Sequence, residues 1–158
     1  NKAARPQGYA EFRPIGSSYA SRTMLMSGLI VFVFVIYHLL HFTVQVQYVN
    51  FTGQSFGTFE DPQKRHDIYK MMVVGFNIVW VSGFYVLGMG LLCLHLSHGA
   101  SSMFQSMGWK NRAYTPILDK LARAVALLIF LGYTSIPVAI LFGYGQDYVQ
   151  GLRGVGPL

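Results

Sequence analysis

The sequence predicts an all-α membrane protein, a transmembrane helical bundle with three spanning helices. Only 11% of the 158 residues are charged and 53% are hydrophobic, whereas soluble domains carry about 25% charged residues. The charges are also segregated, because none lies within 23–59, 71–109 or 124–146. A spanning helix needs ~20 mostly apolar residues, so each segment has room for one. We therefore treat residues 1–158 as a single membrane domain, in which the net charge of +6 does not indicate nucleic-acid binding.

The first spanning helix is expected over about residues 23–48. Its core, GLIVFVFVIYHLLHF, is rich in β-branched and aromatic residues, which favour strands in soluble proteins. Length decides for a helix, since strands rarely exceed ten residues and a lone segment in lipid must satisfy its own backbone hydrogen bonds.

The second and third spanning helices are expected over about residues 71–99 and 121–142. The second carries Gly75, Gly83, Gly88 and Gly90, and such small residues let another helix or a flat cofactor approach the backbone closely. A short helix whose first turn holds residues 60–62 is expected to lead into it. Pro137 lies inside the third helix and should kink it, and residues 143–158 form a Gly-rich tail.

The distribution of Lys and Arg predicts the orientation in the membrane. Three spans place residues 1–22 and the loop at 100–122 on one side, and these two segments hold most of the basic residues. We therefore expect 1–22 to be a cytoplasmic segment and 143–158 to lie on the outer side.

Histidines are the candidate functional residues within the spans. His38 and His41 lie in the first expected helix, and His95 and His98 in the second, each pair spaced i, i+3. An ionisable residue in a membrane helix is costly and is a functional candidate, and neutral imidazole is an axial ligand of haem iron. The alternative is that each histidine donates an interhelical hydrogen bond. Two histidine-bearing helices, one of them glycine-rich, favour haem, whereas His66, in a hydrated loop, is expected to be an ordinary surface residue.

The two pairs are expected at different depths. His38 is sixteen residues past Arg22, or ~24 Å at the helical rise, and His95 is twenty-five residues past Lys70, or ~37 Å. In a bilayer of ~40–45 Å with its headgroups, His95 then lies near the cytoplasmic face and His38 in the outer half, more than ~10 Å apart in height. If both are ligands, there are two haems, and each takes its second histidine from outside this chain.

Other chemistries are excluded or disfavoured. A single cysteine, Cys93, excludes an internal disulfide and any multi-cysteine metal or iron–sulfur site. The sequence has no P-loop, no GxGxxG after a strand and no HExxH motif. The spans contain no Asp or Glu, which disfavours a proton pump or a proton-coupled transporter.

Three stretches carry a resemblance to a known family. They are SSYASRTMLMSGLIVFVFVIYHLLHF, then GLLCLHLSHGASSMFQSMGWKNRAYTPILDKLARA, then GYTSIPVAILFG. Together they resemble the di-haem, five-helix cytochrome b subunit of bacterial succinate dehydrogenases and the related fumarate reductases, over about residues 4–143. The LHLSHG…FQ…G…YTP run is the most specific part. The chain matches the last three helices of that haem-binding bundle; because it begins at Asn1, it is either processed or part of a longer polypeptide.

The resemblance implies two b-type haems, each held by histidines from two different helices. His38 resembles the ligand of the haem nearer the outer face, and His95 resembles the ligand of the haem nearer the cytoplasm. His41 and His98 occupy positions that need not be histidine in the family, so they are expected to be packing or propionate-side groups, with His98 as the alternative ligand to His95.

Haem propionates need cations or hydroxyl donors near the membrane interface. The expected candidates are Ser21 and Arg22 on the cytoplasmic side and Lys70 on the outer side. The alternative for each is the positive-inside bias or snorkelling at a helix end.

The resemblance implies a membrane anchor of succinate:quinone oxidoreductase, a respiratory enzyme of the tricarboxylic acid cycle, in the bacterial cytoplasmic membrane. It would pass electrons from the iron–sulfur subunit through two haems to a quinone, with menaquinone expected, and would not itself bind succinate. The implied partners are the flavoprotein and iron–sulfur subunits, the quinone and membrane lipid. Residues 90–94, GLLCL, lack the carboxylate that some fumarate reductases of this family carry there, which favours succinate oxidation. The alternatives are an anchor of a quinol:fumarate reductase or other di-haem quinol oxidoreductase, and a haem-free structural subunit.

Overall fold

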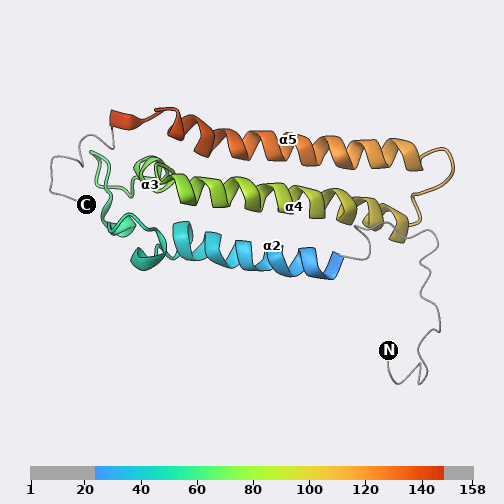
Figure 1. The fold of residues 1–158 in the computed structure, drawn as a ribbon. Coiled ribbons are helices and arrows are strands. Elements are labelled where there is room, and N and C mark those ends of the chain that lie inside the picture. The colour runs from blue at the N-terminus through green and yellow to red at the C-terminus, as the bar shows by residue number, and fades with distance from the viewer. Residues whose placement is uncertain (1–23, 148–158) are drawn as a thin grey trace, which may run out of the picture.

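Three long helices lie side by side in the computed structural model, which describes residues 24–147 (Figure 1). Helix α2 spans Met24–His38 and continues as a π-helical turn, η1, over Leu39–Thr43. Helix α4 spans Val79–Ser106 and helix α5 spans Thr115–Leu141. Each is long and apolar enough to cross a membrane. The predicted all-α transmembrane bundle is therefore confirmed.

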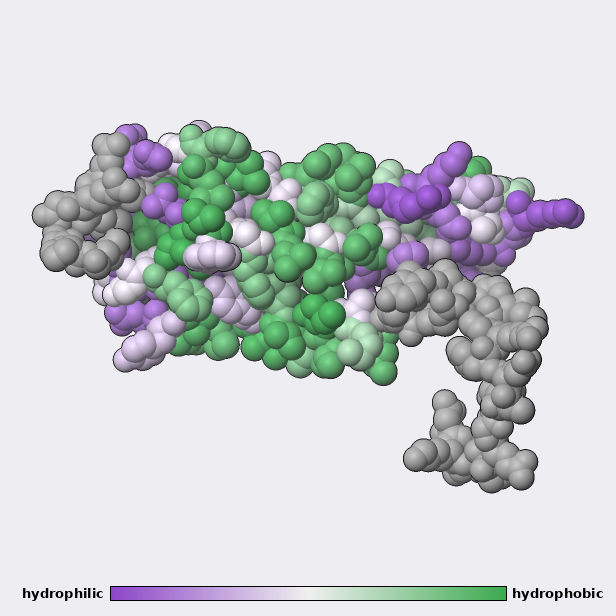
Figure 2. Space-filling model, viewed as in Figure 1, coloured by the Kyte–Doolittle hydropathy of each residue, from purple (hydrophilic) through white to green (hydrophobic). Residues whose placement is uncertain are grey.

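The shorter elements gather at one end of the bundle. They are the 3₁₀ turns η2 (Gln47–Val49) and η3 (Phe56–Thr58) and the helix α3 (Ile68–Phe76). We call this end, with residues 44–78, the loop end, and the opposite end, where residues 107–114 join α4 to α5, the turn end (Figure 1). Hydrophilic residues gather at both ends and hydrophobic residues cover the middle of the face in Figure 2. This banding is the pattern expected of a protein that crosses a bilayer.

The second span was predicted as one continuous helix over about residues 71–99, and this prediction was wrong. Helix α3 ends at Phe76, Ile78 is extended (φ −83°, ψ 115°), and α4 starts at Val79. The carbonyl of Phe76 accepts a hydrogen bond from Ser82 Oγ, so the break leaves this buried group satisfied. Hydropathy could not reveal the break, because the residues on both sides of it are apolar.

The helix ends around the turn end also differ from the expected ones. Helix α4 continues past 99 and closes in a Schellman motif, in which Gly108 has φ +74°, its N–H donates to Gln105 and the Trp109 N–H donates to Phe104. Helix α5 begins at Thr115 rather than 121 and runs through Pro137 to Leu141. At the opposite, loop end, the first span ends at Thr43 rather than at residue 48.

The short helix before the second span begins later than expected. Residues 60–62 were expected in its first turn, but Asp61 accepts backbone hydrogen bonds from Gln63 and Arg65 and closes a tight turn instead. The N-cap is Asp67, whose side chain accepts from the Lys70 N–H at 2.8 Å. An Asp that satisfies the free N–H groups of the first turn is a favoured helix start.

Helices α2 and α4 meet through an aromatic ring lying on a glycine. Phe34 is buried, only 6% exposed, and packs edge-to-face on Tyr85 with ring centroids 5.5 Å apart. A Cβ built at Gly88 would overlap the ring carbons of Phe34, whereas a Cβ at Gly83 would meet nothing within 4 Å. The α2–α4 spacing therefore depends on Gly88.

Gly88→Ala should destabilise the protein, by about 1–3 kcal/mol as for other overpacked cores, because the enclosed Phe34 ring cannot move aside. Gly83→Ala, on the same helix, serves as the matched control and should retain or raise the stability. Thermal unfolding in detergent, followed by circular dichroism, measures both. Equal melting temperatures for the two variants would contradict this description of the α2–α4 contact.

Candidate functional site

The four membrane histidines divide between the two ends of the bundle. His38 and His41 lie toward the loop end, at the end of α2 and in η1, and His95 and His98 lie toward the turn end of α4. The predicted propionate partners Ser21 and Arg22 lie outside the described residues.

His95 sits between α4 and α2. Its Nδ1 lies 3.0 Å from Ser27 Oγ, and its Cε1 would lie 3.3 Å from a Cβ built at Gly28. Ser27 Oγ also donates to the Met24 carbonyl at 3.0 Å. A hydroxyl has one hydrogen, so when Ser27 donates it to the Met24 carbonyl, His95 Nδ1–H is the donor to Ser27 Oγ. The tautomer leaves Nε2 with a free lone pair, the state that a metal-ligating histidine needs.

His38 is exposed and lines an apolar cavity of about 890 Å³. The walls come from α2, α3, α4 and α5, and include Phe34, Met72 and Met89. The His38 ring lies 5.9 Å from the ring of Tyr85, centroid to centroid, with the planes at 68°. The volume lies within the usual 300–1,000 Å³ of ligand and cofactor sites.

His41 is enclosed. It is 0% exposed, its ring centroid lies 4.0 Å from that of Phe42 with the planes tilted by 31°, and its Nδ1 lies 3.0 Å from Tyr85 Oη. Its Nε2 is buried and has no hydrogen-bond partner within the described part of the chain. A Cβ built at Gly75 would lie 3.4 Å from that nitrogen, so the backbone of α3 passes close beside it.

His98 faces a second cavity, of about 680 Å³, lined only by residues of α4 and α5. Polar groups at its turn end form a chain in which Lys110 Nζ lies 2.6 Å from Asp119 Oδ1, and Ser101 Oγ donates to the same carboxylate at 2.8 Å. His98 thus shares its cavity with a neutralised ion pair, whereas His95 contacts α2.

Lys70, the expected outer propionate partner, has its ammonium 5.0 Å from the centroid of the Phe59 ring. It is not among the residues that line the cavity of His38. His66, expected to be an ordinary surface residue, is exposed but does line that cavity, next to Gln45. The polar groups nearest His38 at the loop end therefore differ from the expected one.

The two candidate ligands lie at different heights. His95 contacts Ser27, and His38 lies eleven residues farther along α2, which is ~16 Å at the helical rise. This separation agrees with the difference of more than ~10 Å estimated from the sequence. His38 and His95 are too far apart in height to ligate one iron.

The described histidines stand singly rather than in a converging set of metal ligands. Within residues 24–147, no group of three His, Cys, Asp or Glu side chains converges to hold an ion, as a dedicated zinc site would require. A histidine that ligates haem iron binds it through one ring nitrogen that is free of other partners. His95, with its Nε2 lone pair free, and His38, at a large apolar cavity, each meet that requirement.

Two contacts of these histidines escaped the sequence analysis, namely those of Ser27 and Tyr85. The estimated depths contained a signal for Ser27, because they place His95 beside the start of the first span, where Ser27 is the polar residue. Tyr85 gives no such signal, since its contact with His41 depends on helix rotation.

The fold and these residues define a helical membrane protein with histidines at two heights. No family profile, curated protein or solved structure matches this chain.

Tyr85→Phe should lower the stability by about 1–3 kcal/mol, the cost of a buried polar group left unpaired, because His41 Nδ1 then loses its partner. Tyr48→Phe is the control, since Tyr48 is 93% exposed. Thermal unfolding in detergent compares the two. A Tyr85→Phe protein as stable as the control would show that the His41–Tyr85 contact is not a hydrogen bond.

Proposed function

We propose that this chain is the haem b-bearing membrane anchor of a succinate:quinone oxidoreductase, which passes electrons from the iron–sulfur subunit through two haems to a quinone. The observation that carries the proposal is the pair of histidines, His38 and His95, at two heights: His38 lines the larger cavity, and His95 is half-buried between α4 and α2. Two haems at different depths are what an electron path across a membrane requires. The motif resemblance supports the same assignment.

His95 ligates the inner haem through Nε2. Ser27 fixes the ring orientation and the tautomer, as the hydrogen-bond partners of metal-ligating histidines do. Gly28 leaves room for the imidazole edge, because a Cβ there would lie 3.3 Å from Cε1. These contacts make α2 the support of a ligand that α4 carries.

His38 ligates the outer haem from the wall of the larger cavity. Within the described residues it makes no hydrogen bond, unlike His41 and His95, and its ring is held by packing against Tyr85 and Phe42. When bound, haem would supply one-electron transfer. The role of the protein is to position the ring and to keep it in an apolar surrounding.

The orientation gives the side of the membrane on which the proposed partners would dock. By the positive-inside rule, the turn end, with Lys110 and Arg112, faces the cytoplasm, where the iron–sulfur and flavoprotein subunits would dock. The quinone, with menaquinone expected, would react nearer the outer haem. The proposed location is the bacterial cytoplasmic membrane.

A haem-free structural subunit is the second candidate. The observations that favour it are the hydrogen bonds His95–Ser27 and His41–Tyr85, which both join α2 to α4. An anchor of a quinol:fumarate reductase would share the histidines and cavities described here and differ in the direction of electron flow.

Substitution of the two ligands should remove two different haems. His38→Leu should abolish the outer b-type signal and His95→Leu the inner one in the dithionite-reduced minus oxidised spectrum of the purified complex. His98→Leu is the matched control on α4 and should keep both signals.

An intact complex without any haem signal would contradict the proposal and favour the structural subunit. Loss of a signal in His98→Leu but not in His95→Leu would instead correct the inner ligand and keep the function.

Ser27→Ala should loosen the inner haem by about 10–100-fold, the usual effect of removing the partner of a metal-ligating histidine. Ser97→Ala is the control, because Ser97 Oγ donates only within its own helix, to the Leu94 carbonyl at 2.9 Å. The ratio of haem to protein, measured during dilution into haem-free detergent, reports the retention. Equal retention in the two variants would mean that Ser27 does not support the ligand.

A further inference from the structure

Two polar side chains from distant segments meet at the loop-end rim of the His38 cavity. Gln45 Nε2 and His66 Nε2 lie 2.9 Å apart, across 21 residues of sequence. Both residues line the cavity, together with Thr43. No Asp or Glu is among the lining residues, so this rim offers amide, imidazole and hydroxyl groups without a competing anion.

Gln45 is held in an energetically unfavourable backbone conformation. Gln45 has φ +60°, a left-handed conformation that costs a residue with a side chain about 1–3 kcal/mol and is common at ligand-binding positions. It lies two residues past the end of η1, whose last turn is closed by hydrogen bonds from Val44 and Val46. Its Nε2 also lies 3.5 Å from Met71 Sδ, which further restrains the amide.

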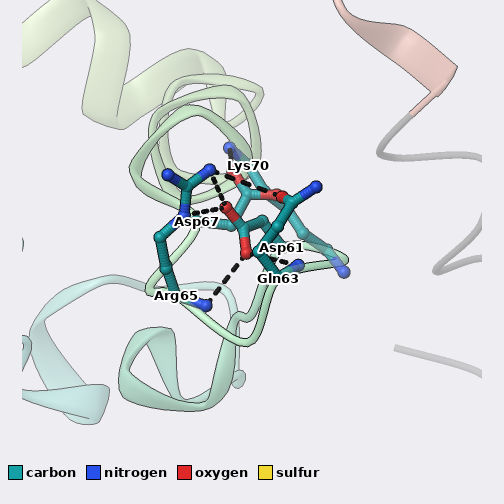
Figure 3. Close-up of polar contacts among 5 residues, drawn as sticks. All are labelled: Asp61, Gln63, Arg65, Asp67 and Lys70. Carbon is teal, nitrogen blue, oxygen red and sulfur yellow. Dashed lines mark hydrogen bonds and ion pairs between the residues drawn. The ribbon is translucent and has the colours of Figure 1, made fainter.

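His66 lies at the end of a turn that a backbone bridge and several hydrogen bonds stabilise. Residues 60 and 66 form an isolated antiparallel bridge, and Asp61 within the turn accepts from the Arg65 backbone N–H and from its guanidinium (Figure 3). These hydrogen bonds hold the pKa of Asp61 below its ordinary value, so the carboxylate that closes the turn is ionised at neutral pH. Asp67, the next residue after His66, caps α3.

The rim lies at the height that the edge of a haem bound at His38 would reach. Thr43 lies five residues past His38, about 7 Å farther toward the loop end at the helical rise. Haem carries its two propionate carboxylates on one edge, away from the central iron. A haem ligated at the height of His38 therefore presents these anions toward the rim when that edge faces the loop end.

We infer that His66 and Gln45 bind a propionate carboxylate of the outer haem. The inference rests on the proposed function, and it gives these two residues the role expected of Lys70, whose ammonium lies on Phe59. Donors to a propionate stabilise the more negative, reduced form of the haem, so they raise its midpoint potential.

The test is a potentiometric titration of both haems in the purified complex. His66→Leu and Gln45→Leu should each lower the midpoint potential of the outer haem, with about a tenfold change in the reduction equilibrium corresponding to ~59 mV for a one-electron couple. His66→Gln, which keeps a donor, should restore most of the shift. Gln47→Leu is the matched control, because Gln47 bonds the Gly53 carbonyl instead, and the inner haem is an internal control.

The outcomes separate the inference from the proposed function. Two haems with unchanged potentials in His66→Leu would overturn the inference and keep the function. Equal shifts of both haems, or a change in quinone kinetics without a change in potential, would also overturn it. A wild-type complex without haem would overturn the proposed function itself.

Discussion

The contact of Phe34 with Gly88 sets the register of α2 against α4, and the two interhelical histidine contacts depend on that register. It fixes how far α2 stands from α4 and how the two antiparallel helices are aligned. Ser27 then lies opposite His95, toward one end, and His41 lies opposite Tyr85, toward the other. A small shift of one helix along the other would remove both hydrogen bonds together. The two hydrogen bonds are therefore coupled through one packing contact, although Ser27 and His41 are fourteen residues apart, which is ~21 Å at the helical rise.

The break between α3 and α4 gives the loop end a shape that a continuous helix would not provide. Because the chain turns at Ile78, α3 packs beside η1, and Phe56, Phe59, Met71 and Val74 form a small core there. Gly75 of α3 lies against the rings of His41 and Phe42. The i, i+3 pair of α2 is thereby divided, because His41 is closed off by α3 while His38 keeps an open side toward the cavity.

The sequence predicted the features that follow from composition and helical rise. The absence of charges from three long segments predicted the spans, and the number of residues between His38, His95 and the nearest charges predicted their difference in height. The break at Ile78 was missed because the apolar pattern is the same on both sides. The Asp67 cap was missed because Glu60 and Asp61 look equally suitable before a helix, and only the turn closed by Asp61 decides between them. The His66–Gln45 contact joins residues of two loops, and no periodicity connects them.

The energetics of His41 argue against the view that the histidines serve only to join helices by hydrogen bonds. Interhelical hydrogen bonds in membranes contribute about 0.6 kcal/mol on average, whereas a buried polar atom without a partner costs about 1–3 kcal/mol. His41 gains one such bond, to Tyr85, and leaves Nε2 unpaired, so on these magnitudes it does not stabilise the bundle by hydrogen bonding. His41 instead fixes the hydroxyl of Tyr85. The ring centroid of Tyr85 lies 5.9 Å from that of His38. Positioning of the His38 ring explains an enclosed histidine at this place better than adhesion between helices does.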